Sequence, residues 1–164
     1  MGRKHRHRFH GDAKRFEVVA AFIYDRYGRS IQHIADVAGG QGMLCRILRK
    51  QYNYDCEIVD PRGWALKGVP NQAVAFEPSI ADYYDLIVGL HPDEATRPVA
   101  QAALVRPVIL IPCCNYWSDD KLGRDELIEA IAGYYREHRV VFERVTFLFQ
   151  GPKNIGIVSE PPGR

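Results

Sequence analysis

The chain has 164 residues, of which 46% are hydrophobic and 26% charged, as expected for one globular domain with a sizeable core. It contains no run of about 18 apolar residues, and its charged N-terminus lacks the apolar stretch of a secretory signal, so we expect neither a membrane span nor secretion. The four cysteines show no framework spacing, which predicts reduced thiols in a cytoplasmic protein.

The formal net charge is only +2, but positive charge is concentrated at the N-terminus. Residues 1–16 contain six Lys and Arg side chains and a single acid, with three histidines interleaved. We expect residues 1–11 to form a flexible basic tail and residues 12–164 to form one folded domain. Arg6 and Arg8 are candidates to contact the phosphates of a nucleic acid, and a solvated tail without a ligand is the alternative. The histidine spacing fits no zinc finger, so we expect no metal there.

The first predicted element is a helix over residues 12–27, because its apolar side chains recur on one face at helical spacing. Asp12 is a candidate N-cap and Gly28 a candidate C-cap. A strand over 31–37 then runs through a loop of small residues into a helix over about 42–52.

A second strand follows at 56–59 and also ends in an acid. The order of strand, tight loop, helix and strand is the arrangement that holds an adenosine-containing cofactor. The candidate contacts are the loop residues and the acids that end the two strands, namely Asp36, Ala38, Gly39, Gly40, Gly42 and Asp60.

The residue types of this loop suit a ligand that lies against the main chain. Gly40 and Gly42 allow backbone angles that are closed to residues with a Cβ atom. Asp60 is placed where a carboxylate accepts hydrogen bonds from both hydroxyls of a ribose. No Lys, Ser or Thr follows Gly42, so the loop is not built for a triphosphate with magnesium. The alternative is an ordinary glycine-rich turn.

The rest of the chain alternates strands and helices and then ends in two strands. The connection over 61–72 is rich in Gly and Pro and has room for at most one helical turn. Few residues then remain to cross the sheet to the next strand, so either the strand after this connection is short or the crossing is nearly extended. The predicted elements after it are strands at 73–76 and 85–90, a helix at 93–104, a strand at 108–111, a helix at 124–138, and strands at 140–149 and 155–159.

At this point the sequence resembles the class I S-adenosylmethionine-dependent methyltransferases. Their first motif, acid-x-Gly-x-Gly-x-Gly, is matched by Asp36, Ala38, Gly40 and Gly42 with one Gly-to-Ala change, and their second acid is matched by Asp60. The resemblance implies an α/β, Rossmann-like single domain with helices on both faces of a seven-stranded, mostly parallel sheet that ends in an antiparallel strand pair. It also implies S-adenosyl-L-methionine as the cofactor.

A narrower resemblance comes from two short motifs. The segments 88–91 (Val-Gly-Leu-His) and 112–114 (Pro-Cys-Cys) are similar to a methyltransferase-like branch that includes tRNA ribose 2′-O-methyltransferases. This branch implies that RNA, and tRNA in particular, accepts the methyl group.

The loops after the strands form the expected binding edge of the sheet. Arg62, beside Asp60 on this edge, is a further candidate contact of the cofactor. Glu77 is a candidate to accept a hydrogen bond from an adenine amino group, or else a solvated loop acid. His91 is a candidate base for the proton of the acceptor, with Asp93 to orient it or to bind the acceptor directly. The alternative is that Asp93 caps the helix that follows and His91 only ends a strand.

The segment after the strand at 108–111 is the candidate acceptor site, formed by Pro112, Cys113, Cys114, Asn115 and Tyr116. Base-modifying relatives carry Asn-Pro-Pro-Tyr here, and the different residues of this chain make an exocyclic-amine mechanism doubtful. A nucleophilic cysteine is one interpretation, but no Lys or Arg adjoins the pair in sequence, so pocket-wall thiols are the default.

We expect an enzyme that transfers a methyl group from S-adenosylmethionine to RNA. The basic N-terminus suits RNA, and the chain adds no separate domain to close over a small acceptor. The Lys-Asp-Lys-Glu tetrad of ribose methyltransferases is not visible. Two alternatives therefore remain: a degenerate fold that acts as a nucleic-acid-binding or scaffolding module, and a methyltransferase that acts on protein or a small molecule.

Overall fold

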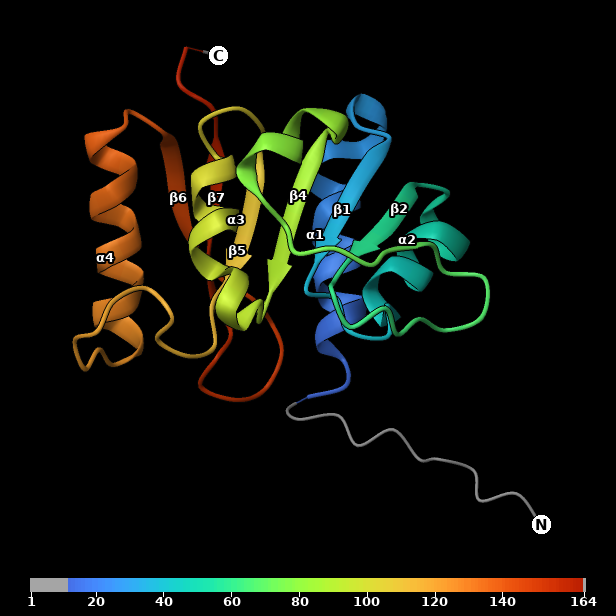
Figure 1. The fold of residues 1–164 in the computed structure, drawn as a ribbon, viewed down its shortest axis with the longest axis horizontal. Coiled ribbons are helices and arrows are strands. Elements are labelled where there is room, and N and C mark those ends of the chain that lie inside the picture. Colours follow the sequence, from blue (N-terminus) through green and yellow to red (C-terminus); the bar gives the residue numbers. More distant parts are fainter. Residues whose placement is uncertain (1–11, 164) are drawn as a thin grey trace.

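The computed structural model describes residues 12–163, and seven strands in this part of the chain form one sheet (Figure 1). The strands are β1 (His33–Val37), β2 (Asp55–Val59), β3 (Asn71–Gln72), β4 (Leu86–Leu90), β5 (Val108–Ile111), β6 (Val141–Thr146) and β7 (Ile155–Glu160). Their order across the sheet is β3-β2-β1-β4-β5-β7-β6. The first five strands pair in parallel, whereas β7 runs antiparallel to both β5 and β6. The mixed sheet with a C-terminal antiparallel pair is confirmed.

Two pairs of helices cover the two faces of this sheet. They are α1 (Arg15–Tyr27) and α2 (Met43–Tyr52) on one face, and α3 (Thr96–Ala102) and α4 (Arg124–Glu137) on the other (Figure 1). Neighbouring strand residues point to opposite faces. Ile34 accordingly joins the core under α1 and α2, while Ala35 joins the core under α3 and α4. Strands β4 and β5 are buried along their whole length, as expected for central parallel strands covered on both faces.

Helix α1 starts three residues later than the sequence predicts. The Asp12 carboxylate does not cap the helix; instead it accepts hydrogen bonds from the backbone N–H groups of Lys14 and Gln150, at 2.9 Å each. This pair of bonds ties the entry of the helix to the turn between β6 and β7. The predicted C-cap is confirmed, because Gly28 has a φ of 50° and donates its N–H to the carbonyl of Tyr24.

Strands β3 and β6 also differ from their predicted bounds. Strand β3 is only two residues long and lies before the predicted 73–76, where it pairs with the end of β2. The short strand leaves room for a 3-10 helix, η2 (Pro78–Tyr83), on the way to β4, so the crossing is not extended. Strand β6 ends at Thr146 rather than 149, because its partner β7 begins at Ile155 directly opposite.

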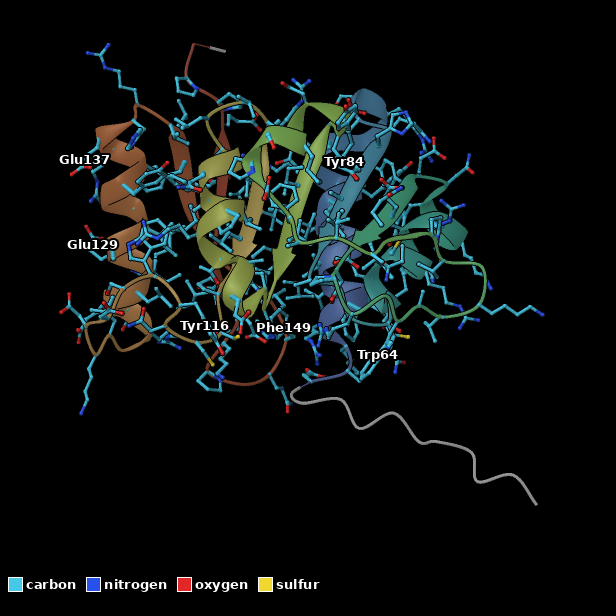
Figure 2. The ribbon with its side chains drawn as sticks, viewed as in Figure 1. Trp64, Tyr84, Tyr116, Glu129, Glu137 and Phe149 are labelled. Atoms are coloured by element: carbon cyan, nitrogen blue, oxygen red, sulfur yellow. The ribbon has the colours of Figure 1, made fainter. Side chains whose placement is uncertain are left out.

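The helix predicted over 93–104 is divided. Asp93 has a φ of 50°, which a right-handed helix does not accept, so no regular helix begins at this residue. The segment instead contains a 3-10 turn, η3 (Asp93–Ala95), followed by α3. Figure 2 shows Tyr116, Phe149 and Trp64 along the same edge of the molecule, where β4 ends. Within residues 12–163, no helix has the length and apolar character that crossing a bilayer would require.

Candidate functional site

The loop between β1 and α2 has little room for side chains. A Cβ atom on Gly42 would lie 2.5 Å from Cδ1 of Ile58, and Gly42 also has a φ of 88°. A Cβ atom on Gly39 would lie 2.5 Å from the carboxylate of Asp36. Ala38, which stands where the methyltransferase motif has glycine, takes a φ of 53° and donates its N–H to the carbonyl of Val59 at 2.9 Å. The loop therefore presents backbone rather than side chains to whatever lies above it.

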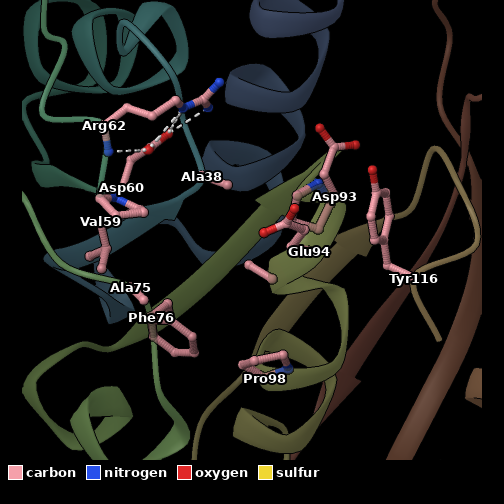
Figure 3. A pocket seen from close by; sticks show the side chains of 13 residues that line it. Ala38, Val59, Asp60, Arg62, Ala75, Phe76, Asp93, Glu94, Pro98 and Tyr116 are labelled. Atoms are coloured by element: carbon pink, nitrogen blue, oxygen red, sulfur yellow. Dashed lines mark hydrogen bonds and ion pairs between the residues drawn. The ribbon is translucent and has the colours of Figure 1, made fainter.

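Asp60, at the end of β2, is the centre of a hydrogen-bond cluster. Its carboxylate accepts the backbone N–H groups of Gly40 at 3.1 Å and Arg62 at 3.0 Å. The guanidinium group of Arg62 adds a two-pronged contact, with Nη2 2.7 Å from Oδ2 (Figure 3). Burial acts to raise the pKa of Asp60, but the hydrogen bonds from Arg62 and Gly40 prevail and hold it below its usual value. The carboxylate is therefore ionised and paired with Arg62.

Asp36 lies beneath the glycine-rich loop and is only 2% exposed. Burial raises the pKa of this carboxyl group to about 7, and nearby Asp60 adds to the rise. Its Oδ2 atom has no hydrogen-bond partner among the described residues. Asp36 is not among the residues that line the cleft above the loop. The structure thus places it where it supports the loop from below.

A cleft of about 420 Å³ opens above the ends of β1 and β2. Ala38 and Asp60 line it on the loop side, and Arg62 lies beside Asp60 (Figure 3). Asp93 and Tyr116 face them from the ends of β4 and β5. Its apolar wall includes Val59, Ala75, Phe76 and Pro98. The cleft thus has the paired Asp60 carboxylate at its β2 end and an apolar wall beside it.

Glu77 is exposed and is not among the lining residues, although its neighbour Phe76 is. Gly39, Gly40 and Gly42 shape the loop without lining the cleft themselves. Of the predicted cofactor contacts, the structure brings Ala38, Asp60 and Arg62 together. The sequence missed Glu94, because nothing in a short acidic segment says which side chains turn inward.

A second cavity of about 490 Å³ adjoins the first at Asp93, which lines both. His91, Cys113 and Cys114 line this second cavity, together with side chains that the sequence did not place there: Asp12, Arg15, Phe149 and Lys153. Residues 149–153 reach the site because β6 ends early and the chain after it turns back into β7. The edge of the sheet therefore carries two connected compartments.

His91 is held in one orientation in this second cavity. Its Nε2 atom lies 2.8 Å from the carbonyl oxygen of Lys153. A carbonyl oxygen only accepts, so Nε2 carries the hydrogen and donates it. Burial lowers the pKa of His91, which outweighs the opposing effect of that hydrogen bond. The ring is therefore neutral at pH 7 and its Nδ1 atom is an acceptor.

Asp93 does not cap the helix that follows it. Its side chain makes no capping hydrogen bond. The hydroxyl group of Thr96 instead donates a hydrogen bond to the backbone carbonyl of Asp93, at 2.7 Å. The Asp93 carboxylate instead accepts a hydrogen bond from Cys113 Sγ at 2.7 Å. The capping alternative is thus wrong, and the side chain is left facing the site.

The five residues predicted as the acceptor site separate into four environments. Pro112 is buried and Tyr116 is exposed at the cleft. The Asn115 side chain makes hydrogen bonds within its own loop. It accepts from the N–H groups of Trp117 and Ser118 and donates to the carbonyl of Asp120.

The thiols of Cys113 and Cys114 line the second cavity, and the Lys153 ammonium group donates to Cys114 Sγ at 3.5 Å. A cation therefore adjoins the pair in space although none does so in sequence. Arg6 and Arg8 lie outside the described residues.

No protein-family model and no curated protein sequence matches the chain. Its fold does match solved structures. The sugar N-methyltransferase KedS8 from Streptoalloteichus sp. ATCC 53650 is similar with a TM-score of 0.56 and 12% identity, over 98% of each chain. A proposed S-adenosyl-L-methionine-dependent methyltransferase from Methanococcus maripaludis gives 0.54 and 16%, over 91% of this chain and 86% of its own. A proposed rRNA methylase from Clostridium thermocellum gives 0.53 and 9%, over 96% of this chain and 100% of its own.

These structures share little sequence with the chain, so what they have in common with it is the arrangement of the elements. That arrangement includes nearly the full length of the chain, and it agrees with the strand order and the antiparallel β7 described above. The chain therefore has the fold of the class I S-adenosylmethionine-dependent methyltransferases.

Proposed function

We propose that the protein is an S-adenosylmethionine-dependent methyltransferase that acts on RNA. The observation that carries this proposal is the pair of compartments that meet at Asp93. One has the features of an adenosine cleft and the other contains a neutral histidine with a free acceptor atom.

The first compartment fits the cofactor by its shape and its chemistry. The backbone of the loop between β1 and α2 approaches closely because any Cβ atom at Gly39 or Gly42 would collide with the structure below. Asp60 would accept the ribose hydroxyls, and Val59 and Phe76 would pack against the adenine ring. S-adenosylmethionine would supply a methyl group on a positively charged sulfur.

The second compartment would hold the acceptor. His91 keeps its Nδ1 lone pair available because Nε2–H is committed to Lys153. A neutral imidazole near pH 7 is a suitable base for the proton that the acceptor loses. Asp93, at the junction, would orient the acceptor towards the first compartment. The residue roles predicted for His91 and Asp93 thus remain part of this proposal.

RNA is the acceptor that the charge distribution favours. Residues 1–11, which carry four of the six cations among residues 1–16, are joined directly to Asp12, and Asp12 and Arg15 line the second cavity. Lys153 adds a cation to the same wall. The second cavity itself has two acids and two bases, so the excess positive charge comes from residues 1–11, which would suit a phosphate backbone. The similarity of segments 88–91 and 112–114 to tRNA methyltransferases favours tRNA among RNAs.

The test is transfer of a labelled methyl group from S-adenosylmethionine to three substrate pools: total RNA, a protein extract and a mixture of metabolites. We expect label in RNA, and we expect it to fall with rising salt and in a chain that lacks residues 2–10. Label found only in protein or metabolites contradicts the RNA proposal. Labelling that is unaffected by the truncation shows that the basic N-terminus has no part in it.

A binding module without catalysis is the second candidate, because Arg62 already occupies the carboxylate of Asp60. Calorimetry with S-adenosylmethionine, S-adenosylhomocysteine and NAD separates the two. The enzyme proposal expects the first two ligands to bind and Asp60→Asn to weaken them by about 1–3 kcal/mol, the cost of a charge-assisted hydrogen bond. Failure of all three ligands to bind would favour the module.

A further inference from the structure

Three side chains with metal-ligating atoms meet at the second cavity. Asp93 follows β4, and Cys113 and Cys114 follow β5, the parallel neighbour of β4. Because the two strands end at the same edge, their loops bring one carboxylate oxygen and two sulfur atoms within 4.8 Å of one another. Cys113 Sγ is 2.7 Å from Oδ1 of Asp93.

The chemistry of these three groups is that of a zinc site. Zinc takes cysteine sulfur at about 2.3 Å and carboxylate oxygen at about 2.0–2.2 Å in a tetrahedral arrangement, which puts the ligand atoms roughly 3.5–4 Å apart. The observed spacing allows this after a small outward rotation of Cys113, which is only half-buried. Two thiolates favour zinc over magnesium or calcium, which prefer oxygen ligands.

Charge and access also suit a cation at this place. Zinc with two thiolates and one carboxylate would leave a single negative charge, and the Lys153 ammonium group beside Cys114 would offset it. Asp93 and Cys114 are exposed, so an ion can enter from solvent. Three protein ligands leave the fourth tetrahedral position open, as in catalytic rather than structural zinc sites.

We propose that Asp93, Cys113 and Cys114 bind a zinc ion whose fourth position opens into the cavity beside His91. The ion would take a sulfur, nitrogen or oxygen atom of an incoming molecule at that position. Zinc binding itself does not depend on methyl transfer, whereas a role for the ion in holding the acceptor rests on the proposed function.

The test uses the full chain, reduced and stripped of metal with a chelator, then loaded with zinc and measured for metal content. We expect about one zinc ion per chain. Loss of an outer-shell partner of a metal already costs about 10–100-fold in affinity, so Cys113→Ser, Cys114→Ser and Asp93→Asn should each weaken binding at least about 100-fold. Asp119→Asn, which removes an exposed acid from the neighbouring loop, is the matched control and should bind normally.

The histidines of the N-terminus are a second potential zinc ligand set, so the experiment is repeated with His5, His7 and His10 all replaced by Asn. Zinc that survives in this triple variant and is lost in Cys113→Ser supports the proposal. Zinc lost with the histidines and kept in Cys113→Ser overturns it, as does the absence of bound zinc in the unmodified chain.

Two further measurements test whether the cysteine thiolates bind the ion: the absorption spectrum with cobalt and the pH dependence of zinc affinity. Cobalt in place of zinc should give an intense thiolate-to-metal absorption band that Cys113→Ser reduces. Because zinc binds thiolates and not thiols, binding releases protons, and zinc affinity should rise with pH. Asp60→Asn should keep zinc, and Cys114→Ser should keep S-adenosylhomocysteine, so failure of one proposal is distinct from failure of the other.

Discussion

The guanidinium Nη2 of Arg62 lies 2.7 Å from Oδ2 of Asp60, and its Nε lies 3.0 Å from Oδ1, so one cation contacts both oxygens of the acid that ends β2. The Asp60 side chain is 2% exposed, whereas that of Arg62 is 55% exposed. An adenosine ligand that uses Asp60 for its ribose must therefore share this carboxylate with Arg62 or displace the guanidinium group into solvent.

The first prediction is that Arg62→Ala tightens the binding of S-adenosylhomocysteine. The Arg62 side of this ion pair is exposed to solvent, so we expect its competition to be worth about 1 kcal/mol or less and its removal to improve the dissociation constant by up to about fivefold. Calorimetry measures the change. Lys67→Ala removes an exposed cation from the same connection and should have no effect. Weaker binding by Arg62→Ala would mean that Arg62 contacts the ligand itself.

The second prediction concerns the glycines. Gly42→Ala should lower the free energy of unfolding by about 1–3 kcal/mol, because the new Cβ atom would meet Ile58 at 2.5 Å and the backbone φ is 88°. Gly133→Ala, in α4, meets nothing within 4 Å and should raise stability by about 0.5–1 kcal/mol. Urea denaturation measures both. Equal effects at the two positions would contradict the tight packing of the loop.

The third prediction is a pH dependence of stability caused by Asp36. Burial raises its pKa in the folded protein to about 7, above the usual value of about 3.9 for an aspartate, so the folded state binds more protons between these two pH values. Stability should therefore fall as pH rises from about 4 to 7, by an amount on the order of 3–4 kcal/mol from this group.

Asp36→Asn cannot ionise and should remove that part of the slope, so that the variant is the more stable protein at pH 8. The measurement is urea denaturation of both proteins at pH 5, 6, 7 and 8. Parallel pH profiles for the two proteins would show that Asp36 is not the group responsible.

The fourth prediction tests His91 and rests on the proposed function. Methyl transfer should fall as pH drops through the lowered pKa of His91, since only the neutral ring accepts a proton. His91→Gln should abolish this limb of the pH profile and reduce kcat by at least about 100-fold. His138→Gln, which replaces an exposed histidine at the end of α4, is the control and should keep the normal profile. If methyl transfer by His91→Gln still falls at low pH as it does in the unmodified protein, a group other than His91 accepts the proton.

Local sequence patterns were sufficient for most of the elements near the site. The apolar runs and helical spacing predicted β5 with its observed bounds, and α2 and α4 to within about a residue at each end. The small residues between Asp36 and Gly42 predicted the tight turn between β1 and α2. These features depend on contacts within one element or between neighbours in the chain, where side-chain periodicity and glycine content are direct signals.

The tertiary structure decided what depends on distant partners. Strand β6 ends where β7 supplies no further partner, and Asp93 breaks the predicted helix because its backbone follows the end of β4. Lys153 reaches Cys114 only through the turn between the last two strands. The pairing of Asp60 with Arg62, the burial of Asp36 and the meeting of Asp93 with Cys113 likewise arise from packing. Hydrogen-bond pairing and burial are set by atoms far apart in sequence, so no local pattern encodes them.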